Sequence, residues 1–464
     1  MEIINEIVDF LSGVLWNYIL VYMLIAGGLY FSYKIKFIQF RYIKHMIALL
    51  FNSGKRSGKE EKISSFQAFA ISSASRVGTG NLAGVAMAIY LGGAGAVFWM
   101  WVLAIIGAAS SMIENTLAQA YKVKNDDGTF RGGPAYYMEQ GLGSKKMGML
   151  FSILIIVSFG LVFNAVQAHT ISNSFHKAFG VDVTIVGVGL IIASGLVIFG
   201  GLKRIANVAQ VIFPFMALGY LFVALFVTLV NYDQIPAMFG DIFAQAFGIE
   251  QAGSGALGFM IMQGIKRGLF SNEAGMGSTP NAGATADVSH PVKQGFIQTL
   301  GVFVDTLVIC STTAFLVLST NAIGQSDLNG IQLTQYAVST VLGHSGNVFI
   351  AVMILLFSFT SIIGNYYYGE SNIEFMTENK LILNIFRGSV LAMIMFGSLA
   401  HIDVVWNLAD VFMGFMALLN TYAIFKLFKI ANALIEDYIT QLKAGKDPVF
   451  DKDKVPQLKN VECW

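Results

Sequence analysis

Long apolar stretches recur along the chain, each about the length of a membrane-spanning helix, with short polar connections between them. A bilayer core of about 30 Å needs roughly 20 apolar residues per helical crossing. The pattern predicts eleven spans, and an odd number places the termini on opposite sides of the membrane. We expect the spans at 14–33, 66–91, 95–121, 148–172, 182–201, 205–230, 255–280, 291–319, 346–369, 382–400 and 404–429.

Two of these spans carry polar residues and glycines where a plain membrane helix would have neither. The stretch "SASRVGTGNLAGVA" (73–86) and the stretch "RGLFSNEAGMGSTPNAGATA" (267–286) both combine glycines with Asn, Ser or Thr. Glycine disfavours a helix interior by about 1 kcal/mol relative to alanine, and polar groups are costly in hydrocarbon. The two stretches lie five spans apart, so equivalent units beginning at them would have opposite orientations. This is the geometry of an inverted repeat, in which paired broken helices line a central site.

The ends of a broken helix predict what would bind there. The first span resumes around Thr79, Gly80 and Asn81, where free N–H groups favour an anion such as a carboxylate. Free carbonyls near Ala74 and Val77 suit a cation such as sodium. A zwitterionic amino acid matches both poles. The alternative is that the small residues only permit close helix packing. We favour this interpretation less, because two breaks occur at matched positions.

Composition and charge fit an all-α polytopic membrane protein. Hydrophobic residues make up 55% of the 464 and charged residues 12%, whereas soluble domains are near 25% charged. Lys and Arg are frequent in 34–62 and absent from 231–254 and 320–345, which predicts an outside N-terminus and a cytoplasmic C-terminus in a multi-pass cell-membrane protein. A net charge of +1 gives no indication of a nucleic-acid partner.

Three segments fall outside the spans. Residues 37–52 alternate basic and apolar positions at helical spacing and are expected to lie at the cytoplasmic lipid interface, while the charged tail from 440 is expected to be partly disordered. The cysteines, Cys310 in an apolar span and Cys463 near the C-terminus, do not form a disulfide framework. We find no nucleotide-binding loop, metal-spaced histidines or paired nucleophile and base, and therefore expect neither an enzyme nor a cofactor.

Intramembrane charges are functional hypotheses by default, but here most are interpreted as structural. Asn272, beside a carboxylate in the second break, is a candidate ligand for substrate or ion, and Arg76 is expected to be the fixed partner of a carboxylate. The acidic residues are Glu114, Glu273, Asp305, Glu370 and Asp410, with Arg76, Lys266, Arg267 or free backbone N–H groups as expected partners.

The motifs "SRVGTGNLAGVA", "GGPAYYMEQGLG", "RGLFSNEAGMGS", "VDTLVIC" and "NYYYGE" resemble those of the alanine or glycine:cation symporters, also called the sodium:alanine symporter family, over nearly the whole chain. The resemblance implies a five-plus-five inverted repeat similar to the leucine-transporter fold, with one extra N-terminal helix. The expected parts are 1–65, the repeats 66–230 and 255–430, and a cytoplasmic tail at 431–464. It also implies import of a small neutral amino acid coupled to sodium, with alanine or glycine as the expected substrate and glutamine as a further candidate.

Site residues follow from the same resemblance. Thr79 and Gly80 would hold the substrate carboxylate, with Gln167 of "FNAVQAHT" reaching it, and Thr360 and Ser361 would complete a sodium site. Asn365 lies one helical turn further on and replaces a Trp found in family members that resemble alanine carriers, which suggests a larger, polar side-chain pocket. The alternatives are a proton-coupled symporter and, less favoured, a channel, for which no repeated filter motif is present.

Overall fold

The computed structural model describes residues 2–52, 62–248, 254–320, 322–324, 328–400 and 402–464. Helices dominate, and the strands of the described part are β1 (Val123–Lys124) and β2 (Phe130–Arg131), which pair antiparallel. The all-α architecture expected from the apolar pattern is confirmed.

Within the first half of the chain, helices begin with α1 (Glu2–Val14), which continues through a π-helical segment (Leu15–Leu20) into α2 (Val21–Lys34). The elements that follow are α3 (Ile38–Arg41), α4 (Ile43–Asn52), α5 (Ser65–Arg76), a π-helical segment (Gly80–Gly84), α6 (Val85–Gly92), α7 (Gly95–Ala120), α8 (Pro134–Gln140), α9 (Lys145–Ile155), a π-helical segment (Ile156–Phe163), α10 (Asn164–Phe179), α11 (Val183–Ile198) and α12 (Gly201–Val230).

After α12 the chain forms a 3₁₀ turn (Tyr232–Gln234) and a second set of helices. These are α13 (Ile235–Ala246), α14 (Ser254–Asn272), α15 (Pro280–Gly283), α16 (Pro291–Phe303), a π-helical segment (Val304–Cys310), α17 (Ser311–Ser319), α18 (Gly330–Leu342), α19 (His344–Met376), α20 (Lys380–Leu399), α21 (Ile402–Lys443) and a final 3₁₀ turn (Lys452–Lys454).

Local sequence signals set several of these boundaries. Ser64 and Gln67 form a reciprocal capping box at the start of α5, and Asp182 and Asn379 cap α11 and α20 through their side chains. Such caps satisfy N–H groups that a helix leaves without a partner in its first turn. Gly180 ends α10 in the left-handed conformation that glycine adopts readily, with φ of 68°.

Eight helices of the described part are long and apolar enough to cross a membrane: Glu6–Lys34, Gly95–Ala120, Lys145–Phe179, Gly201–Val230, Pro291–Ser319, His344–Met376, Lys380–Leu399 and Val405–Lys443. Each overlaps a predicted span. The other three predictions fall on the interrupted segments α5–α6 and α14–α15 and on the 16-residue α11. Length and composition therefore confirm a multi-pass membrane protein but do not by themselves confirm a count of eleven.

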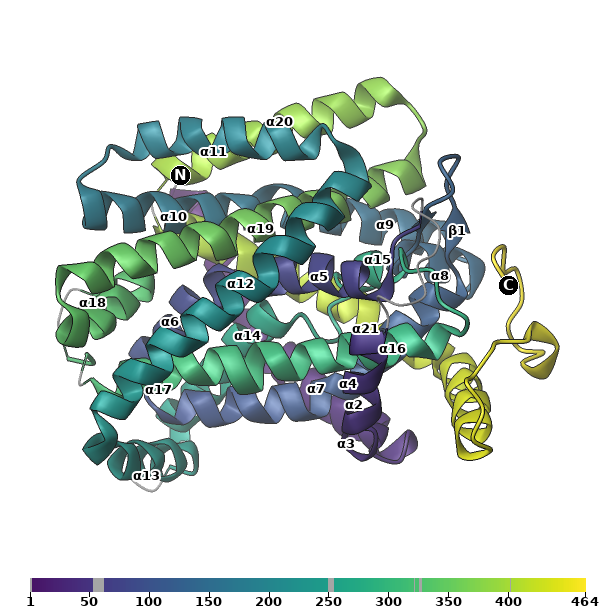
Figure 1. The fold of residues 1–464 in the computed structure, drawn as a ribbon, viewed down its shortest axis with the longest axis horizontal. Helices are drawn as coiled ribbons and strands as arrows, with labels where there is room; N and C mark the ends of the chain where they lie inside the picture. The colour runs from purple at the N-terminus through teal and green to yellow at the C-terminus, as the bar shows by residue number, and fades with distance from the viewer. Residues whose placement is uncertain (1, 53–61, 249–253, 321, 325–327, 401) are drawn as a thin grey trace.

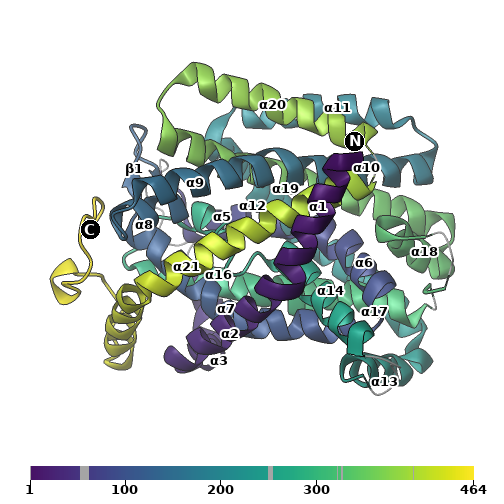
Figure 2. The same cartoon turned by 180° about the vertical axis from the view of Figure 1, so that it is seen from behind.

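The interrupted helices lie in the middle of the molecule, surrounded by longer helices. Figures 1 and 2 show α7 and α16 along one side, α11 and α20 together on the other, and α12 crossing between them. The contacts agree, since α7 packs against α16 and α14, and α19 packs against α10. Apolar helices thereby enclose polar segments whose exposure to lipid would destabilise the fold.

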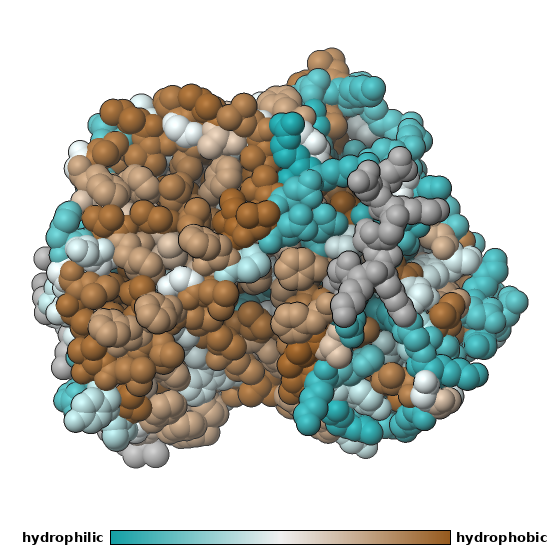
Figure 3. All heavy atoms as spheres, in the orientation of Figure 1, coloured by the Kyte–Doolittle hydropathy of each residue, from teal (hydrophilic) through white to brown (hydrophobic). Residues whose placement is uncertain are grey.

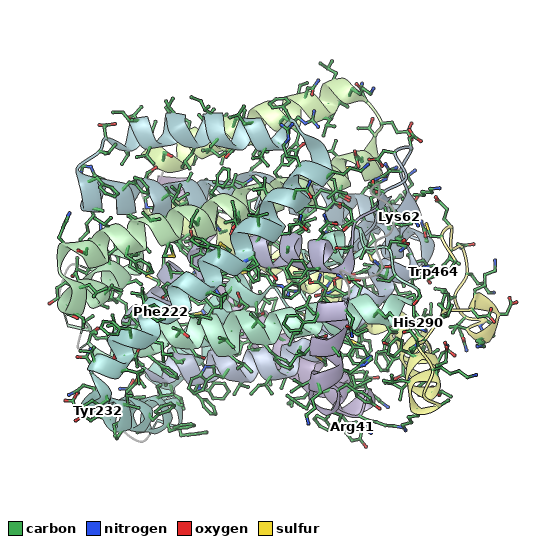
Figure 4. All side chains as sticks on the ribbon, in the orientation of Figure 1. Arg41, Lys62, Phe222, Tyr232, His290 and Trp464 are labelled. Atoms are coloured by element: carbon green, nitrogen blue, oxygen red, sulfur yellow. The ribbon has the colours of Figure 1, made fainter. Side chains whose placement is uncertain are left out.

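The face of the molecule drawn in Figure 3 divides into a broad apolar region and a hydrophilic end. Figure 3 shows hydrophobic residues over α10, α11, α12 and α20, while hydrophilic residues gather at the end that carries α8, β1 and the C-terminus. We call this the tail end. In Figure 4, Lys62, His290 and Trp464 lie at the tail end, whereas Tyr232 lies at the opposite end, and Phe222 is 76% exposed on the apolar face.

The C-terminal region is more structured than the sequence predicted. Helix α21 continues to Lys443, well beyond the expected end of the span at 429, and the chain from 444 to 464 then packs back onto the tail end. Phe450 and Leu458 are buried, and the Trp464 indole donates to the carbonyl of Gln119 at 3.0 Å. The expected disorder was wrong, because the charged tail contains apolar and aromatic residues that find partners only in the folded protein.

Candidate functional site

The first break separates α5 from the π-helical segment that begins at Gly80. Asn81 stabilises it, because the Asn81 Oδ1 atom accepts a hydrogen bond from the N–H of Gly78 at 3.0 Å. The next N–H, that of Thr79, donates to Oε1 of Gln167 on α10 at 3.0 Å. Gly78 and Thr79 therefore present consecutive N–H groups that only side chains satisfy.

The second break lies between α14 and α15 and depends on a carboxylate from another helix. Gly275 and Gly277 have φ of 83° and 85°, in the region that glycine adopts readily. Their N–H groups donate to Oε1 and Oε2 of Glu114 on α7, both at 3.0 Å, and Asn420 of α21 donates to the same carboxylate at 2.7 Å. Glu114 thus satisfies the freed backbone groups, one of the structural roles that the sequence allowed for it.

The two breaks meet in the centre of the protein. Ser75 of α5 donates to Oε1 of Glu273 at 3.0 Å. Asn81 and Ser271 both donate to the Asp305 carboxylate, at 2.7 and 2.9 Å, so Asp305 joins the broken segments to the π-helical turn before α17. These residues are nearly or fully buried.

Gly78 and Gly80 allow this close approach. A Cβ atom at Gly78 would lie 2.2 Å from Oγ of Ser361 and 2.9 Å from Oε1 of Gln167, and one at Gly80 would lie 3.0 Å from the Phe270 ring. Contacts below 3.0 Å require a neighbour to move. The backbone at the first break is therefore directly accessible to side chains from α10 and α19.

Thr79 and Gln167, both predicted from the sequence to bind the substrate carboxylate, are in direct contact with each other. The partner of the Thr79 N–H is an uncharged amide oxygen, so this N–H already binds an oxygen acceptor. The Thr79 hydroxyl also lies 2.9 Å from the hydroxyl of Ser358 on α19. Gly80 begins the following helical turn, which directs the positive end of its dipole toward the same point.

Two of the four predicted sodium ligands are in direct contact with each other. The Ser361 hydroxyl on α19 donates to the carbonyl of Ala74 at 2.8 Å. Val77 follows α5 as its C-terminal cap. The Thr360 hydroxyl instead donates to Leu356 and Phe357 of its own helix, at 3.0 and 2.8 Å, which is the common role of a helical threonine.

Two other predicted ligands are engaged in the scaffold. Asn81 uses its oxygen on Gly78 and its amide nitrogen on Asp305. Asn272 accepts from the N–H of Ala274 at 3.0 Å and donates to the Thr306 hydroxyl at 3.2 Å. Asn365 differs, because its oxygen accepts from Ser75 at 2.7 Å while its Nδ2 atom has no hydrogen-bond partner among the described residues.

The buried charges outside this centre have mostly structural partners. Asp410 pairs with Lys266 at 2.6 Å and Arg267 at 2.9 Å, as the sequence suggested. Glu370 pairs with Arg387 at 2.9 Å, a partner that was not anticipated. Arg76 donates to the carbonyl of Gln298 at 3.1 Å, and no ion pair of Arg76 is found within the described part of the chain. Its charge nevertheless acts on the buried carboxyl groups of Glu114, Glu273 and Asp305, so the expected partnership with a carboxylate is electrostatic and not a direct contact.

Aromatic residues that the sequence analysis did not single out border the first break. Phe159, Phe163, Phe270 and Trp406 form a continuous column, with ring centroids 4.4, 4.6 and 4.8 Å apart in that order. Tyr368 on α19 joins the same column at Phe159, at 5.5 Å. No periodic signal distinguishes these rings from the many other aromatic residues in apolar spans.

Comparisons with known proteins find relatives that match nearly the whole chain. A sequence model of the sodium:alanine symporter family matches residues 1–452. The chain is 51% identical over 463 residues to the probable sodium/glutamine symporter GlnT of Bacillus subtilis (strain 168), covering 100% of this chain and 96% of the relative. It is 35% identical over 425 residues to the sodium/alanine symporter AgcS of Methanococcus maripaludis, covering 89% of this chain and 93% of the relative.

A solved structure supports the fold. The crystal structure of MhsT in complex with L-phenylalanine superposes with a TM-score of 0.54 at 13% identity, covering 88% of this chain and 94% of that chain. Likeness at this identity concerns the fold alone, and the expected similarity to the leucine-transporter fold is confirmed at that level. Because the family model and close relatives cover the chain almost from end to end, this protein belongs to the sodium:alanine symporter family.

Proposed function

We propose that the protein imports a small neutral amino acid by sodium-coupled symport. The observation that carries the proposal is the juxtaposition at the first break. The N–H of Thr79 has an oxygen from Gln167 as its partner, and the carbonyl of Ala74 has a hydroxyl from Ser361, within one short stretch of chain. An α-carboxylate suits the first pole, whereas a sodium ion suits the carbonyl and hydroxyl oxygens of the second.

The scaffold supports binding of this kind because the site is held by other helices. Glu114 and Asp305 stabilise the broken segments without contacting the Thr79 N–H. Gln167 would then exchange its bond to Thr79 for a bond to the substrate, with Gly80, Asn81 and Asn272 shaping the pocket wall. The relatives' names include both alanine and glutamine carriers, which supports a neutral amino acid and leaves its side chain to be assigned.

Alternating access would then follow from movement of one repeat against the other around this centre. We place the repeats at 66–230 and 255–430, as the positions of the two breaks suggest. The Lys and Arg distribution supports an outside N-terminus and a cytoplasmic tail end. In this orientation, α13 and α18 lie outside.

Uptake in proteoliposomes tests the function. Purified protein should accumulate labelled alanine or glutamine above the external concentration when an inward sodium gradient is imposed, because coupled ion movement supplies the free energy. A proton gradient in sodium-free buffer is the control for the proton-coupled alternative. Uptake that only equilibrates under both gradients would contradict symport and indicate a channel.

Orientation is tested by cysteine labelling in a Cys463→Ser background. Gly240→Cys on α13 should react with an impermeant maleimide added to intact cells, whereas Asp126→Cys, between β1 and β2, should react only after permeabilisation. The expectation rests on the positive-inside rule. Reaction of position 126 in intact cells would reverse the assignment.

The sodium site is tested by removing hydroxyl groups one at a time. Ser361→Ala should raise the sodium concentration for half-maximal uptake at least tenfold, because the Ser361 hydroxyl lies on the Ala74 carbonyl. Thr360→Ala should have a smaller effect, since its hydroxyl bonds back to its own helix. Linked binding requires that substrate affinity at low sodium falls with sodium affinity.

The matched control is Ser389→Ala, which removes an exposed hydroxyl bonded back within α20. An unchanged sodium dependence in the Ser361→Ala protein would place the ion elsewhere.

A further inference from the structure

Four polar residues gather beside the proposed carboxylate and sodium poles. Ser75 directly follows Ala74, whose carbonyl belongs to the sodium pole, and Asn365 follows Ser361 by four residues on α19, a separation of about 6 Å along a helix. Ser75 donates to both Asn365 at 2.7 Å and Glu273 at 3.0 Å. Tyr368 follows Asn365 by three residues on α19, so the two side chains share one face of the helix, and the Tyr368 hydroxyl lies near Ser75 and the Glu273 carboxyl group.

Two hydrogen-bond donors of this cluster have no acceptor within the described part of the chain. The Nδ2 atom of Asn365 and the hydroxyl of Tyr368 have no hydrogen-bond partner among the described residues, although Asn365 is 1% and Tyr368 0% exposed. A buried donor left without a partner destabilises a protein by about 1–3 kcal/mol. Such groups in a protein interior therefore point to a ligand that supplies the missing acceptor.

We propose that Ser75, Glu273, Asn365 and Tyr368 form a subsite for a carboxamide side chain, which makes glutamine the preferred substrate. The amide oxygen accepts from Asn365 and Tyr368, and the amide nitrogen donates to the Glu273 carboxylate. Glutamate would place a second carboxylate against Glu273, and alanine would leave both donors unpaired. This inference rests on the proposed symport, because a carboxamide side chain reaches the subsite only when the carboxylate and sodium poles hold the main chain of the substrate.

A competition assay tests the subsite. Labelled alanine and labelled glutamine are both measured in sodium-driven uptake, with glutamine, methionine and glutamate as competitors. Methionine matches the length of glutamine without its amide. In the unmodified protein, glutamine should compete at least tenfold better than methionine or glutamate, because a site with buried polar groups rejects analogues that cannot pair them.

Two variants remove the donors separately. In Asn365→Leu and in Tyr368→Phe, the ratio of glutamine affinity to alanine affinity should fall about tenfold, while Asn384→Leu, the same change at an exposed position on α20, should keep the ratio. Sodium-driven alanine uptake with no glutamine competition in the unmodified protein, or an unchanged ratio in both variants, would contradict the subsite. Absence of all sodium-driven uptake would instead contradict the proposed function.

A second, independent set of contacts involves the C-terminal segment 444–464, which we call the tail strap. It pairs with the junction, residues 284–290, which connects α15 to α16. The N–H of Phe450 donates to the carbonyl of Ser289 at 2.8 Å, and the Ser289 hydroxyl donates to the carbonyl of Pro448 at 3.0 Å. Asp447 pairs with Lys293 at the start of α16.

The end of the tail strap contacts the residues that hold the junction from its other side. Trp464 donates to the Gln119 carbonyl, and its ring lies 4.9 Å from the Lys122 ammonium. Gln119 and Lys122 in turn donate to the carbonyl of Ala286 at 3.0 and 2.9 Å. Burial lowers the pKa of Lys122 to about 8. The Lys122 ammonium also lies 4.1 Å from the Phe130 ring, so two aromatic rings and the Ala286 carbonyl surround it.

The junction also contacts the first broken helix. The N–H of Asp287 donates to the carbonyl of Ile63, just before α5, and the Asp287 carboxylate pairs with Lys62 at 2.8 Å. Lys62, His290 and Trp464 lie at the same end of the molecule (Figure 4). The tail-end halves of both broken helices are therefore connected through one short segment, and the tail strap lies on that segment.

We infer that the tail strap is a latch, which must release the junction before the broken helices can open the site toward the tail end. This inference also rests on the proposed transport cycle, since only alternating access requires the junction to move. The backbone pairing of Phe450 with Ser289 offers a position for a reversible cross-link.

The test uses Ser289→Cys together with Phe450→Cys in the Cys463→Ser background. Oxidation should abolish sodium-driven uptake, and reduction should restore it, because a covalent bond prevents release. Each single cysteine variant with the same oxidant is the control. Uptake at the reduced rate by protein that mass spectrometry shows to be cross-linked, or failure of the pair to cross-link, would contradict the latch, whereas absence of uptake in the reduced protein would contradict the proposed function.

Discussion

Backbone groups freed by a broken helix must find partners inside the membrane protein, and this requirement organises the centre of the structure. In hydrocarbon, every unsatisfied N–H or C=O group destabilises the fold by several kcal/mol. The second break is stabilised by the Glu114 carboxylate through Gly275 and Gly277. The first break is stabilised by amide and hydroxyl groups from Asn81, Gln167 and Ser361. The two breaks therefore satisfy the same requirement with different chemistry.

That difference distinguishes the residues that only support the fold from those that a ligand can displace. Glu114 bonds to two backbone N–H groups and to Asn420, so replacing it with a ligand would leave a buried charge without partners. Gln167 and Ser361 are neutral and each offers one bond to the first break, so a carboxylate or a cation can displace them at a smaller cost. Asp305 belongs to the scaffold for the same reason as Glu114, because three hydroxyl or amide groups already donate to it.

Enclosure by the surrounding helices makes these polar contacts stable. The aromatic column from Phe159 to Trp406 lies along one side of the first break, and Asp410 with Lys266 and Arg267 lies beyond Trp406. In a site of low dielectric constant, the hydrogen bonds of a fully satisfied network strengthen one another, whereas a donor without an acceptor destabilises the protein more than it would in water. Asn365 and Tyr368 are the donors in this environment that point most directly to substrate chemistry.

The sequence alone determined the membrane class, the approximate helix positions, the two breaks and the family, because apolar length, glycine and motif order are local properties of the chain. It also selected Ala74, Thr79, Gln167 and Ser361, whose proximity the structure supports. Only the tertiary structure decided that Asn81, Asn272 and Thr360 bond within the scaffold, that Arg387 pairs with Glu370, and that the tail strap is ordered. Thr360 bonds along its own helix, whereas most of the others depend on which donor meets which acceptor across 17 to 345 residues of sequence, as for Glu370–Arg387 and Trp464–Gln119. Pairing of that kind is set by helix packing, which local sequence patterns do not encode.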